Sequence, residues 1–143
     1  MRQPQRTGLR LMLHLDYSKY IGIPFVQKGR DWSGCDCWGL VILIYKEELG
    51  ISLDSYDKEY QNCFTDKNIA KLVELEANKW TKVSKIEPLD VLLFKQKGRS
   101  SHVAIAINDY LMLHTLINVG SCIERWDTGQ WRCCFETAYR YTR

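Results

Sequence analysis

An apolar run that begins at Cys37 constrains the fold of this chain more than any other feature of the sequence. The run continues to Leu49 with apolar residues on nearly all sides, which is typical of a buried helix. Asp36 stands where an N-cap residue belongs, and Gly50 stands where a helix stops. The β-branched residues of the run would also suit a strand, but its length and the glycine favour a helix. The core is therefore expected to form around this helix, with Cys37 in its first turn.

This position makes Cys37 a candidate nucleophile. The positive end of a helix dipole lowers the pKa of a thiol, and the thiolate is the nucleophilic form. Two histidines, His102 and His114, follow downstream inside apolar, alternating stretches that predict strands. A cysteine that opens a helix, with two histidines on later strands, is the arrangement that a cysteine peptidase needs. A single histidine on an apolar strand is more often a core residue, so the catalytic interpretation depends on the register of the two strands.

The turn at Asn108-Asp109 decides whether the two histidines can cooperate. A two-residue loop would put His102 and His114 on opposite faces of the sheet. A three-residue loop would pair Ala106 with Tyr110 and set the histidines directly opposite each other on one face. The sequence permits this second register, in which one imidazole contacts the thiol and the other holds the first in position.

The order of the elements predicts an α+β fold in a single domain of residues 1–143, with helices first and an antiparallel sheet after them. Residues 1–7 are expected to form a loose tail, 9–20 a helical segment and 29–34 a loop. A second helix is expected to start near Thr65 or Asp66. From Trp80 onward the pattern changes to strands, which should form a meander of residues 91–94, 103–107, 110–115, 122–126 and 138–141.

The composition is that of a globular protein without a strong charge bias. The formal net charge is +3 and the basic residues are scattered, so no nucleic acid partner is expected. The arginines near the two ends are interpreted as solvated: Arg2, Arg6, Arg10, Arg140 and Arg143. No apolar run is long enough to span a membrane, and the N-terminus lacks the order of a secretory signal. Synthesis in the cytoplasm is therefore expected.

The six cysteines do not follow the spacing of a zinc ribbon or of a common iron–sulfur motif. Most of them are expected to be buried free thiols. A zinc site formed by Cys37, His102 and His114 is conceivable, but no fourth ligand presents itself. We therefore expect neither a metal ion nor another cofactor.

Several stretches of the chain resemble the NlpC-type cell-wall endopeptidases, which have a papain-like fold. They are most similar to the version found in the tail modules of tailed bacteriophages. The stretches are residues 20–25, 29–31, 34–40, 45–48, 53–56, 88–94, 102–105 and 112–114, in family order. The most specific of them are Asp36-Cys-Trp-Gly39, His102-Val103 and Leu113-His114.

The resemblance implies a role for each matching residue. Cys37 would be the nucleophile, His102 the general base and His114 the third, orienting residue. Asp36 would help to recognise the amino end of the substrate, and Tyr20 would lie near the oxyanion and the substrate. The implied substrates are peptidoglycan stem peptides, which the family typically cuts between D-γ-glutamate and a diamino acid.

The resemblance also implies a place of action at the tail tip of a virion, beside other tail-tip proteins and at the bacterial cell wall or periplasm, after synthesis in the host cytoplasm. Two other classes stay open: a virion structural protein that keeps the fold but works by binding its neighbours, and an acyltransferase. Two residues depart from the family pattern. Leu89 and Ala104 stand where the family usually has glycine. Both are expected to be tolerated packing changes, although Ala104 could narrow the cleft.

Overall fold

The computed structural model describes residues 15–56, 78–96 and 99–142. The expected tail, the second helix near Thr65 and the first part of the segment 9–20 lie outside these residues. The end of that segment forms the 3₁₀ turn η1 (Tyr17–Tyr20). Asp16 caps this turn, because its carboxylate accepts a hydrogen bond from the backbone N–H of Ser18.

The apolar run folds as the expected helix, α2 (Cys37–Ile44), and continues as a π-helical turn, η2 (Tyr45–Leu49). Asp36 caps the start of α2, because its carboxylate accepts a hydrogen bond from the backbone N–H of Gly39. Gly50 ends the helical segment with a φ of 65°, which glycine adopts without a steric penalty. Most side chains of α2 are buried, as its composition predicts.

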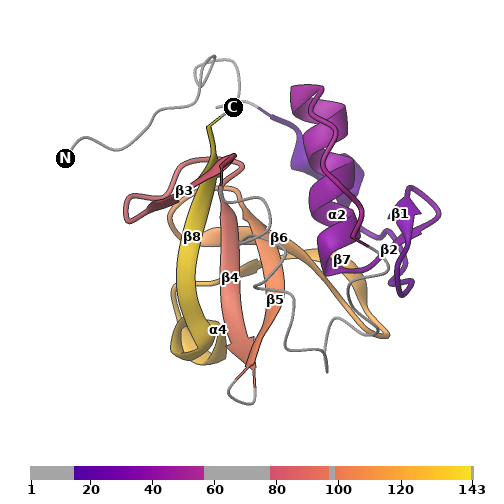
Figure 1. Ribbon diagram of the computed structural model, residues 1–143. Helices are drawn as coiled ribbons and strands as arrows, with labels where there is room; N and C mark the ends of the chain where they lie inside the picture. The colour runs from indigo at the N-terminus through magenta and orange to yellow at the C-terminus, as the bar shows by residue number, and fades with distance from the viewer. Residues whose placement is uncertain (1–14, 57–77, 97–98, 143) are drawn as a thin grey trace.

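The larger of two antiparallel sheets carries most of the fold. It contains β3 (Trp80–Val83), β4 (Val91–Gln96), β5 (Arg99–Ala106), β6 (Leu111–Leu116), β7 (Gly120–Arg125) and β8 (Phe135–Tyr141). Their spatial order is β3-β8-β4-β5-β6-β7. The α+β class is confirmed, and β4 to β7 form the expected meander. The last strand differs from the expectation, because β8 does not extend the meander but inserts between β3 and β4 (Figure 1).

Three short elements were not expected from the sequence. The segment predicted to be a loop contains a hairpin of very short strands, β1 (Arg30–Asp31) and β2 (Gly34–Cys35). Between β7 and β8 the chain forms a short helix, α4 (Gly129–Cys134), which packs against β4. Figure 1 shows α4 at the lower end of the sheet and α2 to one side of it.

Alternate residues of the strands enter two separate apolar clusters, one on each face of the sheet. Val103 and Ile105 of β5 belong to the cluster that includes α2. Ala104 belongs to the other cluster, together with Phe94, and Trp131 of α4 packs against it. Ala104 is buried in this second cluster, so the alanine fills space in the core.

Arg140 is buried, which corrects the interpretation of all terminal arginines as solvated. Its guanidinium binds Asp90 through two hydrogen bonds, from Nε to Oδ1 over 2.9 Å and from Nη2 to Oδ2 over 2.8 Å. Nη1 lies 3.0 Å from a carboxylate oxygen of Glu87, and Nη2 also donates to the backbone oxygen of Lys85 over 2.8 Å. This ion pair fixes the loop before β4 to β8, and the sequence spacing of the partners gave no sign of it.

Leu89 occupies a backbone conformation that favours glycine. Its φ is 71°, in the left-handed region, and its side chain is fully buried. The peptide is held there, because the Leu89 N–H donates to the backbone oxygen of Ala106 and its carbonyl accepts from the hydroxyl of Tyr45. Leu89, at the position where the resemblance implies a glycine, therefore adds apolar burial at the cost of backbone strain.

Variants at this position should separate the two effects. We expect Leu89→Ala to lower the free energy of unfolding by about 2–4 kcal/mol, because it removes buried side-chain atoms and keeps the strain. Leu89→Gly removes slightly more side chain but relieves the strain, so it should be more stable than Leu89→Ala by about 1 kcal/mol. Urea unfolding of the three proteins measures this order. An alanine variant that is more stable than the glycine variant would show that position 89 is unstrained.

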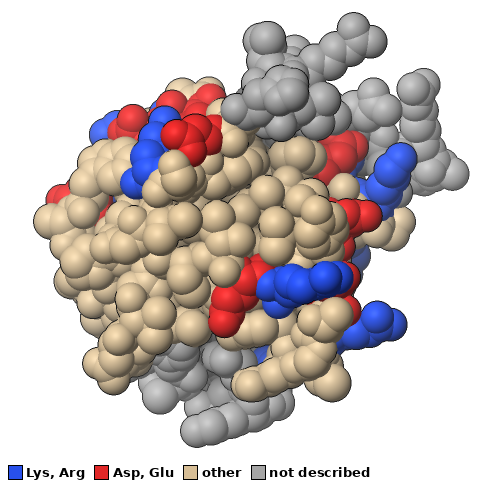
Figure 2. Space-filling view, turned by 180° about the vertical axis from the view of Figure 1, so that it is seen from behind, with Lys and Arg blue, Asp and Glu red and all other residues tan. Residues whose placement is uncertain are grey.

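The described surface mixes charges of both signs. On the face shown in Figure 2, acidic and basic side chains lie next to each other in small groups. One ion pair among the described residues joins Arg125 to Asp127 over 2.8 Å. Among the described helices, none combines the length and the apolar character that crossing a membrane requires.

Candidate active site

Cys37 is the first residue of α2, and only 1% of its surface is exposed. Two hydrogen bonds connect this end of the helix to neighbouring segments. Nη1 of Arg30 donates to Oδ1 of Asp36 over 2.9 Å, and Nε1 of Trp38 donates to the backbone oxygen of Asp54 over 3.0 Å. The first turn is therefore tied to β1 and to the segment after the helix, and Cys37 is held at the helix N-terminus.

His102 on β5 and His114 on β6 are hydrogen-bonded to each other. Nε2 of His102 lies 2.9 Å from Nδ1 of His114, and the two rings meet edge to face with centroids 5.2 Å apart. Both residues are fully buried, and α2 packs against both strands. His102 lies on the face of the sheet that carries Phe94, whereas its neighbour Val103 packs with α2.

The register of β5 and β6 corrects the sequence prediction. Ala106 pairs with Met112, and continuing this register places His114 diagonally from His102, not directly opposite. The shared face is as predicted, because the shift is an even number of residues. The turn is wider than expected because the side chain of Asn108 accepts hydrogen bonds from two backbone N–H groups of the turn, over 2.9 and 2.8 Å.

Glu124 and Trp131 complete the surroundings of the histidines, and sequence reasoning missed both. Oε2 of Glu124 lies 2.7 Å from Nε2 of His114 and accepts a hydrogen bond from Nε1 of Trp131 over 3.0 Å. The indole of Trp131 packs against both imidazoles, with ring centroids 5.1 Å from His102 and 5.0 Å from His114. The sequence did offer a signal for Glu124, because it is a carboxylate on the predicted strand that follows the strand of His114. Nothing in the sequence pattern indicated α4.

Burial keeps both imidazoles neutral. Burial, with a smaller contribution from the neighbouring His114, lowers the pKa of His102 from 6.5 to about 3. Burial also lowers the pKa of His114, against the opposing effect of Glu124, which favours the charged ring. In the resting protein near pH 7, both rings are therefore neutral, and each has one N–H and one nitrogen lone pair.

The depressed pKa of His102 should make the fold sensitive to acid. The unfolded chain takes up the proton near pH 6.5 and the folded chain only near pH 3, so stability falls as the pH drops between these values. One such group contributes at most about 3 kcal/mol between pH 6.5 and pH 4. Urea unfolding at several pH values should show a shallower dependence for His102→Gln than for the wild type. Parallel curves would mean that His102 titrates normally in the folded state.

Asp36 acts in the structure as a buried cap. Its two oxygens accept hydrogen bonds from the backbone N–H groups of Gly39 and Lys28 and from Arg30. The carboxylate is fully buried. The resemblance implies that Asp36 recognises the amino end of a substrate. That amino group would have to compete for the carboxylate of Asp36 with the hydrogen bonds that hold the helix.

Tyr20 is also buried, and its hydroxyl donates to the carboxylate of Glu48. Its ring stacks on Trp32 with centroids 5.2 Å apart. Glu48 lies in η2, whereas Cys37 starts α2, so a rise of 1.5 Å per residue separates them by about 16 Å along the helix. The structure thus places the hydroxyl of Tyr20 toward the end of the helix that is remote from Cys37.

The second thiol near Cys37 differs from it in setting. Cys35 is fully buried in β2, and its Sγ donates to the backbone oxygen of Asp31 over 3.1 Å. Burial, followed by the nearby carboxylates of Asp36 and Asp31, raises the pKa of Cys35 to about 12. Cys35 is therefore a protonated thiol at neutral pH and a poor nucleophile.

One group of side chains has the chemistry of a metal site. Ligand atoms of His114, Cys122 and Glu124 lie within 4.8 Å of one another. Oε2 of Glu124, however, is already used by His114 and Trp131. Burial raises the pKa of the Cys122 thiol, which disfavours the thiolate that a metal would bind. We assign no metal ion to this group, which shares only His114 with the zinc set considered from the sequence.

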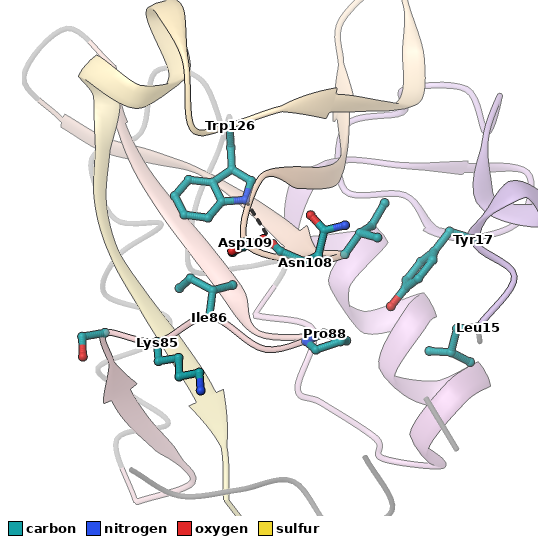
Figure 3. A pocket seen from close by; sticks show the side chains of 10 residues that line it. Leu15, Tyr17, Lys85, Ile86, Pro88, Asn108, Asp109 and Trp126 are labelled. Atoms are coloured by element: carbon teal, nitrogen blue, oxygen red, sulfur yellow. Dashed lines mark hydrogen bonds between the residues drawn. The ribbon is translucent and has the colours of Figure 1, made fainter. Parts of the chain in front are cut away.

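A separate hollow of about 750 Å³ lies beside the loops that precede β4 and follow β5 (Figure 3). Trp126 lines it and donates a hydrogen bond from Nε1 to the backbone oxygen of Asn108 over 3.3 Å. Tyr17 and Pro88 lie along the opposite part of the lining. Among the described residues, the lining includes none of the five predicted site residues, so this hollow is distinct from the histidine pair.

Comparison with known proteins identifies related sequences and folds. The model of the NlpC/P60 family matches residues 22–138. The NlpC/p60 domain of the peptidoglycan hydrolase SagA is 23% identical, with a TM-score of 0.59 over 91% of this chain and 93% of that chain. An NLP/P60 family protein of Staphylococcus aureus, described as similar to a lipoprotein, is 20% identical, with a TM-score of 0.68 over 99% of this chain.

RipA, a protein that interacts with a resuscitation promoting factor, was solved with a histidine mutated. It is 21% identical, with a TM-score of 0.59 over 96% of this chain. The present chain spans 44% of the staphylococcal protein and 65% of RipA, which is less than two thirds of either. A comparison of the sequence with curated proteins found no match. At these identities the solved structures establish a shared fold.

Proposed function

Because the chain belongs to the NlpC/P60 family of cysteine peptidases and peptidoglycan hydrolases, we propose that it hydrolyses peptidoglycan stem peptides. In this proposal Cys37 is the nucleophile, His102 the general base and His114 the residue that orients His102. The observation that carries the proposal is the hydrogen bond between two buried histidines on strands that pack against the helix that Cys37 opens. Neutral imidazoles can accept the proton of a thiol that lies at a helix N-terminus.

The reaction would proceed in two steps. The Sγ proton of Cys37 passes to Nδ1 of His102, and the sulfur electron pair attacks the carbonyl carbon of the peptide bond. The C–N bond breaks, the amine leaves with the proton from His102, and the acyl group stays on sulfur as a thioester. Water then hydrolyses the thioester, using His102 as the base, and the thiol is restored.

The geometry sets one requirement for this mechanism. Nε2 of His102 is engaged by His114, so Nδ1 is the nitrogen that exchanges the proton with sulfur. Nδ1 of His102 and Sγ of Cys37 must come within hydrogen-bond distance in the substrate complex. Catalytic hydrogen bonds that are long without substrate commonly shorten once the substrate is bound. Asp36 supports the step by capping the helix. We infer no direct role for Tyr20.

We further propose that the bond cleaved joins D-γ-glutamate to a diamino acid, and that the protein works at the tail tip of a tailed bacteriophage. It would be made in the host cytoplasm and act at the cell wall or periplasm beside other tail-tip proteins. The support for these finer statements is the resemblance of the stretches around Cys37, His102 and His114 to the phage version of the family.

A second candidate function rests on burial. Cys37, His102 and His114 are each 1% exposed or less, and Trp131 packs over both histidines. An enclosed triad favours a structural protein of the virion that keeps the peptidase fold and acts by binding neighbouring tail proteins.

Digestion of defined muropeptides by the purified protein separates the candidates. Mass spectrometry of the products locates the cleaved bond, and Cys37→Ala serves as the inactive comparison. Hydrolysis that depends on Cys37 supports the peptidase. Tail assembly that tolerates Cys37→Ala but fails after surface substitutions supports the structural role. A new product without hydrolysis would instead indicate acyl transfer.

A further inference from the structure

Glu124 extends the histidine pair to a chain of three hydrogen-bonded side chains on three neighbouring strands. His102 on β5 contacts His114 on β6 over 2.9 Å, and His114 contacts Glu124 on β7 over 2.7 Å. In the register of β6 and β7, Glu124 pairs with Met112, so it lies diagonally from His114 on the same face. The sheet itself therefore brings the carboxylate to the far nitrogen of His114.

This carboxylate determines where the protons of both rings lie. An ionised carboxylate only accepts hydrogen bonds, so Nε2 of His114 must carry the proton that it shares with Glu124. Burial keeps His114 neutral, and its lone pair is therefore on Nδ1. That lone pair accepts the hydrogen bond from Nε2 of His102, which leaves the lone pair of a neutral His102 on Nδ1.

The position of Glu124 is itself fixed by α4. The side chain of Glu124 is 42% exposed, and a carboxylate with that exposure would ordinarily change rotamer. Trp131 prevents this, because its Nε1 donates to the same Oε2 over 3.0 Å while its indole packs on the two imidazoles. The short helix between β7 and β8 thus locks the outer end of the hydrogen-bond chain.

We propose that Glu124 is a positioning residue that acts through His114 and sets the tautomers of both histidines, so that Nδ1 of His102 is the proton-accepting atom. When His102 gains the thiol proton, the negative charge of Glu124 at the end of the chain also favours the resulting cation. The consequence for catalysis rests on the proposed function, whereas the setting of the tautomers does not. Glu124 therefore acts as a fourth member of the site, without contact with the substrate.

The test is ¹⁵N NMR of the imidazoles in the resting protein, together with kinetics. In the wild type we expect both histidines to carry the proton on Nε2 and the lone pair on Nδ1. Glu124→Leu keeps the approximate size but removes the acceptor, so His102 and His114 should each show a mixture of tautomers. The kcat for stem-peptide hydrolysis should fall by roughly 10- to 100-fold with little change in KM. Glu124→Gln retains an acceptor oxygen without the charge, and its kcat should be intermediate.

Glu136→Leu is the matched control. Glu136 is a glutamate of β8 whose carboxylate lies 3.5 Å from Nζ of Lys95, so its loss should leave the tautomers unchanged. Wild-type tautomers and wild-type kcat in folded Glu124→Leu and Glu124→Gln would overturn the proposal. If the wild type cleaves no stem peptide but Glu124→Leu mixes the tautomers, the peptidase function fails and the positioning role of Glu124 stands.

Discussion

Replacement of Cys37 by alanine is expected to lower the kcat for stem-peptide hydrolysis by roughly 10⁴-fold or more, because it removes the sulfur atom that would carry the acyl group. The thermal transition should stay close to that of the wild type, because alanine removes one buried sulfur atom and keeps the helix N-terminus. Mass spectrometry of digested muropeptides measures the turnover, and a thioester trapped at Cys37 would identify the nucleophile directly.

Cys35→Ser is the control for this prediction. Cys35 is buried, its Sγ donates to the backbone of Asp31, and its pKa is raised to about 12. The serine variant can keep that hydrogen bond, so it should retain most of the activity. Wild-type turnover in Cys37→Ala, or loss of turnover confined to Cys35→Ser, would assign the chemistry to a different thiol.

Arg140→Met should cause the largest loss of stability among simple substitutions. It leaves the fully buried carboxylate of Asp90 without its cation, and breaking a buried pair in this way costs about 3–5 kcal/mol. In a domain of this size the melting temperature should fall by roughly 10–20 °C. Calorimetry and urea unfolding measure the change. Activity should decline only where the variant unfolds, because the pair lies outside the histidine chain.

Arg125→Met provides a matched comparison. Arg125 forms an ion pair with Asp127 over 2.8 Å, but its side chain is 56% exposed, so the substitution should change stability by less than about 1 kcal/mol. The double variant Asp90→Asn, Arg140→Met removes both buried charges and should recover part of the loss. Equal effects of Arg140→Met and Arg125→Met would show that burial does not strengthen the inner pair.

Local signals predicted the part of the site that α2 carries. The Asp36 cap, the apolar run and Gly50 act over a few residues, so they specify the helix and the place of Cys37 without tertiary information. The shared face of His102 and His114 was also predicted, because alternation along a strand depends only on parity. The exact pairing was not, because the side chain of Asn108 widens the turn.

Features that depend on distant parts of the chain could not be predicted from one sequence. Arg140 looked like a solvated end because its partner Asp90 is remote in sequence and adjacent only once β8 lies beside β4. Trp131 and Glu124 likewise meet the histidines through the sheet and α4. Their polar and aromatic side chains carry no periodic signal that distinguishes them from surface residues.

The place of β8 has a consequence for the order of folding. β4 to β7 pair with their neighbours in sequence and can form as successive hairpins. β3, in contrast, lies at the edge of the sheet and pairs with β8. During synthesis, β3 cannot pair until residues 135–141 have been made. The chain between β3 and β8 forms a long loop, and closing a long loop is a late and slow step of folding. Since β8 also brings Arg140 to Asp90, the last strand to be synthesised both connects β3 to the rest of the sheet and pairs with a carboxylate whose charge would otherwise oppose burial of the core.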